Sequence, residues 1–70
     1  MQEYISNEVN KLRTQKSITQ EELAEKLKVS RQTIIAIEKG NYAPSVLLAL
    51  KIASFFMLSV EDVFKISYER

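Results

Sequence analysis

The feature that most constrains the fold is a set of four hydroxyl residues, each placed directly before a short stretch of helical character. Thr19 precedes QEEL, Ser30 precedes RQTI, Ser45 precedes VLLAL and Ser59 precedes VEDV. A hydroxyl at this position accepts a hydrogen bond from a free N–H group of the first turn, which stabilises a helix by about 1 kcal/mol. Glu22, three residues after Thr19, completes a capping box. The sequence therefore predicts a helix beginning one residue after each hydroxyl.

Apolar residues support these helix starts and extend the pattern along the chain. Three pairs have the spacing of a hydrophobic staple across a cap: Ile18 with Leu23, Val29 with Ile34, and Leu58 with Val63. Apolar residues also recur at the i, i+3, i+4 spacing of a helix with one buried face. Together these signals predict helices near residues 7–15, 20–27, 31–38, 46–56 and 60–64.

The two ends of the chain carry strand signals. Phe64, Ile66 and Tyr68 alternate with polar residues, which is the period of a strand with one apolar face. The stretch QEYIS near the start could pair with this segment. An isolated two-stranded ribbon is marginal in water, so we expect a short β-ribbon that joins the termini and packs on the helices.

Composition narrows the function classes. The chain has 70 residues, enough for one small domain spanning residues 1–70, and it contains no cysteine and no histidine. A disulfide framework and the usual zinc sites are therefore excluded, and we expect no metal and no cofactor. There is no Gly-rich phosphate loop either, so we expect no enzyme and no small-molecule ligand. No apolar run is long enough to span a membrane and no signal segment opens the chain, which predicts a soluble cytoplasmic protein without a membrane partner.

The two helices predicted at 20–27 and 31–38 are separated only by KVS and form a helix-turn-helix unit, about residues 19–38. The second helix of such a unit lies in the DNA major groove with its first residues at base edges. Arg31 and Gln32 have the donors that read guanine and adenine, and Thr33 lies beside them. Ile35 and Ala36 follow one turn later and could contact thymine methyl groups. For Ile35, a half-buried contact against the preceding helix is the alternative.

Charge distribution points to contacts with the DNA backbone. Between residues 26 and 41 there are four basic residues and one acidic residue, whereas acidic residues gather on either side of this segment. A local basic patch is what phosphate binding requires. The candidates for phosphate contacts are Thr19, Gln20, Lys28, Lys39, Asn41 and Tyr42. The alternatives are that the lysines serve only solubility, that Tyr42 packs on its loop, and that Arg31 and Gln32 are ordinary solvated residues.

Residues 9–64 resemble the Cro/C1-type (Xre-like) helix-turn-helix family of phage and bacterial repressors, and small single-domain members of that family also exist. The resemblance is carried by ITQEELAEKLKVSRQTIIAIEKGNYAPS, LALKIASFF and SVEDVF. It implies a mainly α, five-helix lambda-repressor-like DNA-binding domain and places the family's base readers on Arg31, Gln32 and Ala36. It also implies a structural salt bridge between Arg13 and Glu38.

The chain departs from this family at four positions. Ser17, Lys28 and Met57 stand where family members often have a glycine after a helix. If these three residues adopt a left-handed conformation, each costs about 1 kcal/mol. Ala36 has no hydrogen-bond donor, so one base contact of the family is lost or becomes a methyl contact.

The helix predicted at 46–56 carries two apolar stripes. The expected core stripe consists of Val46, Ala49, Leu50, Ala53 and Phe56. A second stripe contains Leu48, Ile52 and Phe55, and small monomers rarely expose such a patch. We expect these three residues, with Val60, to form a homodimer interface. The alternatives are an apolar surface without a partner and packing beneath the terminal ribbon.

The sequence thus predicts a transcriptional regulator that binds double-stranded DNA. The specific hypothesis is a dimeric repressor at the nucleoid that reads a near-palindromic operator through the helix at 31–38. The alternative is an antitoxin-like or other protein-interaction module, in which the apolar stripe binds a partner protein.

Overall fold

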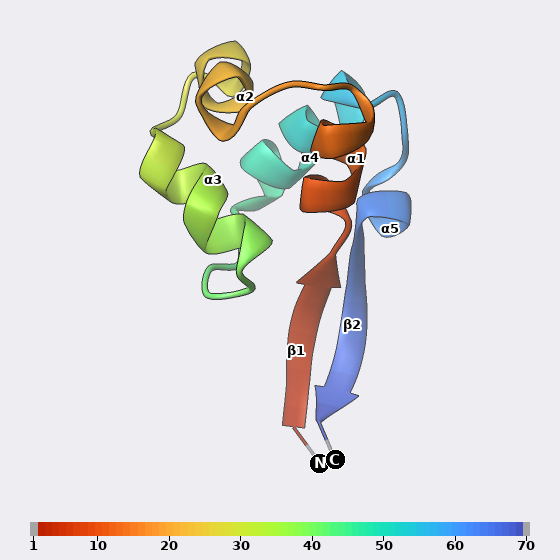
Figure 1. Cartoon of the computed structure of the whole chain (residues 1–70). Coiled ribbons are helices and arrows are strands. Elements are labelled where there is room, and N and C mark those ends of the chain that lie inside the picture. The colour runs from red at the N-terminus through yellow and green to blue at the C-terminus, as the bar shows by residue number, and fades with distance from the viewer. Residues whose placement is uncertain (1, 70) are drawn as a thin grey trace.

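The computed structural model describes residues 2–69 as a helical body from which a two-stranded ribbon projects (Figure 1). In chain order the elements are β1 (Gln2–Asn7), α1 (Val9–Gln15), α2 (Gln20–Leu27), α3 (Arg31–Glu38), α4 (Val46–Phe55), α5 (Val60–Val63) and β2 (Phe64–Glu69). The predicted mainly helical fold, with five helices and a β-ribbon made by the two ends of the chain, is confirmed.

Hydrogen bonds at the predicted caps explain where the helices begin. The Thr19 hydroxyl accepts from the Glu22 N–H at 3.0 Å, and the Glu22 carboxylate accepts from the Thr19 N–H at 2.7 Å. Ser30 and Ser45 each accept from the amide three residues later, at 3.1 Å in both cases. At Ser59 the direction is reversed, because the carboxylate three residues later accepts from its N–H and its hydroxyl. Local polar pairs therefore set the start of four helices.

Four helices are followed by a residue with a left-handed backbone, and three of these four residues are not glycine. Ser17, Lys28 and Met57 have φ of 58°, 60° and 58°, and Gly40 has φ of 79°. These three non-glycine residues are those at which the sequence departs from the glycines of the related family. The left-handed conformation of an L-residue costs about 1 kcal/mol, so each of the three helix ends stores a small strain.

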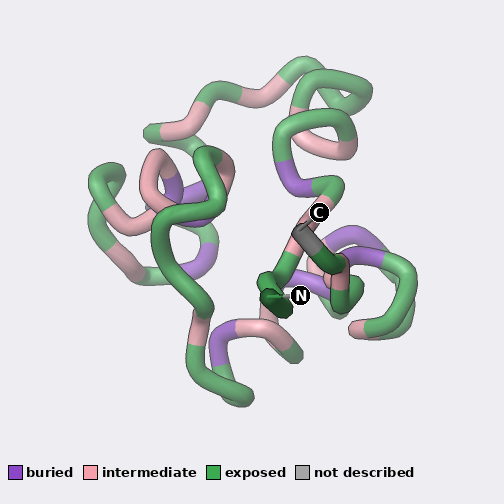
Figure 2. Tube along the Cα trace, turned by 90° about the horizontal axis from the view of Figure 1, so that it is seen from below, coloured by how far each residue is buried: buried purple, intermediate pink, exposed green. Residues whose placement is uncertain are grey.

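The core is formed by the inner faces of all five helices. Its buried side chains are Val9, Leu23, Ala24, Leu27, Ile34, Ile37, Leu48, Ile52, Ala53, Phe56 and Val63. Figure 2, which views the molecule from below, shows the buried positions within the helical body and none on the ribbon. The ribbon therefore contributes no buried residue to the core, and only Phe64, at the start of β2, packs against it.

The expected core stripe of α4 is wrong for two of its residues. Val46 is 77% exposed and Leu50 is 53% exposed, whereas Ala53 and Phe56 are buried as expected. The reason is that α4 is apolar on almost all sides, so the helical period does not decide which side faces the core.

The expected dimer stripe of α4 is wrong for the same reason. Leu48 is 7% exposed and Ile52 is fully buried, so both residues belong to the core of a single chain. Phe55 and Val60 are partly buried and pack against the same core. Phe55 also meets Phe56 edge-on, with the ring centroids 5.0 Å apart. The apolar face that α4 leaves exposed is a different one, which contains Val46 and Leu50.

The ribbon is anchored to the helical body at its base. β1 and β2 pair antiparallel, with Tyr4 opposite Ser67 and Ile5 opposite Ile66. The Asn7 side chain donates to the Ile37 carbonyl at 2.8 Å and accepts from the amide two residues later at 3.0 Å. One asparagine therefore links the end of β1 both to the start of α1 and to the last turn of α3.

Candidate DNA-binding surface

The pair α2–α3 presents the surface that the sequence singles out. The two helices are joined by a short turn, in which the Val29 amide donates to the Ala24 carbonyl at 3.0 Å. Ile34 and Ile37 are fully buried and attach α3 to the core. In Figure 1, α3 lies at the outer edge of the helical body. Its opposite face is therefore available to a ligand.

The predicted base-reading residues share that opposite face of α3. Arg31 and Gln32 are exposed, and Ile35 and Ala36 are partly exposed one turn later. Thr33 is less available, because its hydroxyl lies 2.9 Å from the Ser30 hydroxyl and its amide is bound by the same cap. The face thus offers one guanidinium, one free amide side chain and two apolar side chains.

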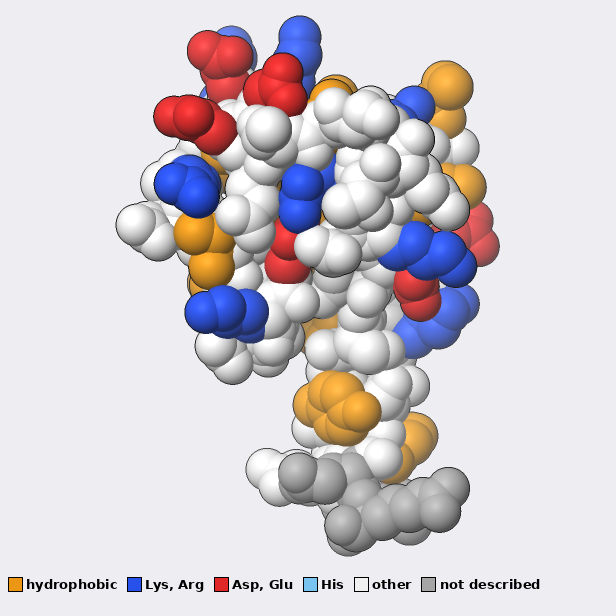
Figure 3. Space-filling view, in the orientation of Figure 1, with side chains coloured by type: hydrophobic (Ala, Val, Ile, Leu, Met, Phe, Trp, Pro, Cys, Tyr) orange, Lys and Arg blue, Asp and Glu red, His pale blue; other side chains and the backbone are white. Residues whose placement is uncertain are grey.

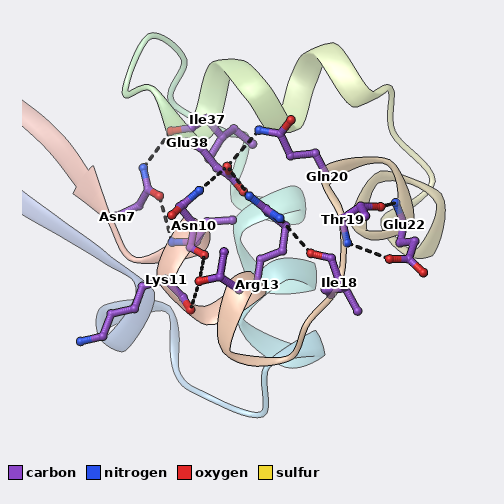
Figure 4. Close-up of polar contacts among 12 residues, drawn as sticks. Asn7, Asn10, Lys11, Arg13, Ile18, Thr19, Gln20, Glu22, Ile37 and Glu38 are labelled. Atoms are coloured by element: carbon purple, nitrogen blue, oxygen red, sulfur yellow. Dashed lines mark hydrogen bonds and ion pairs between the residues drawn. The ribbon is translucent and has the colours of Figure 1, made fainter.

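The predicted salt bridge is the centre of a larger polar network (Figure 4). The Glu38 carboxylate accepts from Arg13 Nε at 2.7 Å and from Arg13 Nη2 at 3.2 Å. It also accepts from the side-chain amides of Asn10 and Gln20, each at 3.1 Å. Arg13 Nη1 donates to the Ile18 carbonyl at 2.8 Å. The network joins α1, the start of α2 and the end of α3, so it fixes the orientation of the helix-turn-helix unit.

Burial and hydrogen bonding act in opposite directions on Glu38. Its side chain is 5% exposed and that of Arg13 is 12% exposed. Burial alone would raise the pKa of Glu38, but the hydrogen bonds from Arg13, Asn10 and Gln20, together with the charge of Arg13, lower that pKa below its ordinary value. The hydrogen bond to Glu38 raises the pKa of Arg13. The pair is therefore charged at neutral pH.

Sequence reasoning missed two members of this network. Asn10 precedes Arg13 by three residues and so lies on the same face of α1, which is the only local signal for it. Gln20 is predicted as a phosphate contact, and its side-chain nitrogen also donates to Glu38 at 3.1 Å, a contact for which the sequence gives no signal. This contact orients the Gln20 side chain at the start of α2.

Two of the predicted phosphate contacts lie beside a predicted base reader. A hollow of about 400 Å³ is lined by Arg13, Thr19, Gln20, Glu21 and Arg31. Thr19 and Gln20 therefore come close to Arg31 even though ten or more residues separate them in the chain. Lys28 lies at the other end of α2, where it is the exposed left-handed cap.

The remaining predicted phosphate contacts lie after α3. Lys39, Asn41 and Tyr42 are exposed, and Lys39 caps the end of the helix. Figure 3 shows acidic and basic side chains side by side at the top, over α2, and basic and uncharged side chains without an acidic one on the left, over α3. The α3 surface is thus the part of this face that suits a polyanion.

Two further features of the structure concern metal ions and membranes. Among residues 2–69, no group of carboxylates is arranged to hold a metal ion. No helix in the same part of the chain has the length and apolar content needed to cross a membrane.

A tight pair of capped helices on a small helical core, with polar side chains on the outer face of the second helix, is the architecture of helix-turn-helix DNA-binding proteins. The sequence model that defines the helix-turn-helix family matches residues 9–63 of this chain. The chain belongs to this family, in its Cro/C1-type branch.

Related proteins agree with this assignment. The chain is 57% identical over 60 residues to an uncharacterized HTH-type transcriptional regulator of Methanocaldococcus jannaschii, covering 86% of this chain and 91% of the relative. It is 49% identical over 65 residues to the uncharacterized HTH-type transcriptional regulator YgzD of Bacillus subtilis, covering 93% and 98%. A crystal structure of a candidate DNA-binding protein from Bacteroides fragilis has the same fold, with a TM-score of 0.77 at 21% identity over 87% of this chain and 98% of that one.

Proposed function

We propose that this helix-turn-helix protein is a transcriptional repressor that binds a near-palindromic operator as a dimer and reads bases with α3 in the major groove. The observation that carries the proposal is the division of α3 into two faces. Ile34 and Ile37 are fully buried, and Arg31 and Gln32 are exposed on the other side. A short helix attached by one face to a rigid core can enter a groove about 12 Å wide.

The roles of the readers follow from their donors and acceptors. The Arg31 guanidinium can donate two hydrogen bonds to O6 and N7 of guanine, and the Gln32 amide can pair with N6 and N7 of adenine. Ile35 and Ala36 have no polar group and suit the methyl group of thymine. Thr33 acts mainly in the cap with Ser30.

Phosphate contacts position the reader helix. Thr19 and Gln20 lie at the start of α2, where unpaired backbone N–H groups and the helix dipole favour an anion. The Thr19 oxygen is already an acceptor in the cap, so its hydroxyl hydrogen remains free to donate. Lys39, Asn41 and Tyr42 would bind the strand that passes the end of α3, and Lys28 would add long-range attraction.

The dimer surface that we propose is the outward face of α4. Val46, Leu47 and Leu50 share one side of this helix, and Leu47 is 69% exposed. A helix that is apolar on all sides is normally covered on all sides. A two-fold interface must be complementary to itself, and an uncharged apolar face meets that requirement without like-charge repulsion. The occupant is therefore a second copy of this chain.

The oligomeric state tests this surface. Leu47→Glu should convert the dimer into a monomer in sedimentation equilibrium and leave the circular dichroism spectrum unchanged. Ile66→Glu is the matched control, since Ile66 is 65% exposed on the ribbon. If the wild-type chain is still a monomer at a concentration on the order of 100 µM, the proposed dimer is disproved. A dimer that survives Leu47→Glu would disprove the surface, and a complex with a different protein in its place would favour the antitoxin-like alternative.

DNA selection tests the function itself. The wild-type chain should enrich a two-fold symmetric sequence from a random duplex library, with half-sites about 34 Å apart. Gln32→Ala should weaken binding to the selected site by about 1–3 kcal/mol and relax the preference at one base position in each half-site. Enrichment of no sequence by a folded sample at low salt would disprove the proposal. Such a regulator would act in the cytoplasm, at the nucleoid.

A further inference from the structure

The ribbon and the end of α3 together enclose a second hollow. Its volume is about 290 Å³, and its lining comes from residues 4–7 of β1 and residues 38–40 at the end of α3. Figure 1 shows β1 as the strand nearer to the loop that follows α3. The hydrogen bond from Asn7 to the Ile37 carbonyl, at 2.8 Å, holds the two sides of the hollow together.

Apart from Ile5 and Gly40, the hollow is lined by polar side chains, and two of these are donors that no carboxylate engages. Lys39 and the Tyr4 hydroxyl have no partner among the described side chains, and Tyr4 is 53% exposed. The only carboxylate in the lining is Glu38, whose oxygens are already bound by Arg13 and two side-chain amides. An ammonium and a phenol near one hollow match the oxygens of a phosphate group.

The two faces of the ribbon differ in character. Directly opposite residues of an antiparallel pair share a face, so Tyr4 and Ser67 share one face with Ser6 and Lys65. The other face carries the Ile5–Ile66 pair and Tyr68. The Ser6 and Ser67 hydroxyls lie 2.9 Å apart, which fixes the polar face beside Tyr4. Between residues 4 and 6 of β1 and residues 65 and 67 of β2, the polar face thus carries three hydroxyls and one cation.

We propose that the ribbon belongs to the DNA-binding surface, and that Tyr4 and Lys39 together bind one backbone phosphate. This inference rests on the proposed function, because it places DNA across the end of α3. Successive phosphates of one DNA strand are about 3.4 Å apart along the helix axis. A strand that passes Lys39 can therefore place a phosphate at the hollow between Lys39 and Tyr4. The ribbon then extends the protein's contacts along the DNA without reading any base.

The test is a pair of matched substitutions on the two faces of the ribbon. Tyr4→Phe removes only the hydroxyl and should weaken binding to the duplex selected by the wild-type chain by about 3- to 10-fold, the value of one hydrogen bond to a charged group. The salt dependence of binding should not change, since no charge is lost. Tyr68→Phe should bind as the wild type does. Lys39→Ala should lower the salt slope by about one.

Ethylation interference provides a second, independent measurement. One phosphate in each half-site should interfere with binding of the wild-type chain when ethylated, and should interfere less with Tyr4→Phe, which keeps only the Lys39 contact to that phosphate. Unchanged affinity and an unchanged interference pattern for Tyr4→Phe would overturn this inference, as would equal losses for Tyr4→Phe and Tyr68→Phe. If the wild-type chain selects a duplex and Tyr4→Phe gives these results, this inference fails and the proposed function stands. If the wild-type chain selects no duplex at all, the proposed function itself fails.

Discussion

Replacing Glu38 by glutamine should remove much of the stability of the domain. The Glu38 carboxylate is 5% exposed and receives four hydrogen bonds, from Arg13, Asn10 and Gln20. The amide keeps the shape but offers one acceptor oxygen in place of two, and it directs an NH₂ group at neighbouring donors. Hydrogen bonds to a charged group contribute about 1.5–3 kcal/mol, and breaking a buried ion pair costs about 3–5 kcal/mol. Because Arg13 retains some exposure, we expect a loss of about 3 kcal/mol.

The lowered pKa of Glu38 also predicts how the free energy of unfolding changes with pH. The folded-state pKa of Glu38 lies below its ordinary value of 4.5. A lowered carboxyl pKa contributes stability that is fully present above the unfolded-state pKa and is lost as the pH falls through the folded-state pKa. The free energy of unfolding of the wild-type chain should therefore fall faster than that of Glu38→Gln below pH 4.5. Asp62, whose pKa is lowered by hydrogen bonds from Ser59, is present in both proteins and cancels in the difference.

Urea denaturation followed by circular dichroism measures both effects. The protein concentration must be held constant, because the stability of the proposed dimer would depend on it. Glu25→Gln is the matched control, since Glu25 is an exposed residue of α2, and its effect should stay within about 0.5 kcal/mol. The reasoning is refuted if Glu38→Gln is as stable as this control, or if its difference from the wild type is the same at pH 3 as at pH 7, on either side of the ordinary carboxyl pKa of about 4.

Two further predictions concern α3 and the strained turn that follows α4. Ile35→Ser should reduce discrimination at one T·A position of the selected site more than it reduces stability, as measured by binding to single-base variants; a loss of stability with base preference intact would assign Ile35 to the fold alone. Met57→Gly should raise the free energy of unfolding by up to about 1 kcal/mol, because Met57 is 84% exposed and has φ of 58°. A destabilised Met57→Gly in urea denaturation would contradict the strain at this helix end.

The parts of the fold that sequence reasoning located correctly are those determined by neighbours in the chain. Thr19 with Glu22 is a pair only three residues apart, and Ser30 and Ser45 bind amides at the same spacing. Such contacts can be read from sequence because the backbone geometry of a helix start fixes which atoms meet. The ribbon was also predictable, since its alternating residues follow the period of a strand.

The polar network was only partly predictable because its contacts are long-range. Arg13 and Glu38 are 25 residues apart, and their pairing was expected from a family resemblance and not from any local pattern. No periodicity in the sequence connects Gln20 to Glu38, although they are 3.1 Å apart. The same holds for Asn7, whose hydrogen bond to the Ile37 carbonyl brings the ribbon beside the end of α3.

The error at α4 has a physical cause and a consequence. Caps located this helix, but its apolar residues surround the axis, so Leu48 and Ile52 were as plausible outside as Val46 and Leu50 were inside. The choice is made by the other four helices, whose inner faces leave room for one side of α4 only. In an isolated small domain the remaining side would be expected to become polar, as the outer faces of α2 and α3 mostly are. That α4 keeps Val46, Leu47 and Leu50 on the solvent side is therefore an argument that this helix has two apolar partners: its own core and a second copy of the chain.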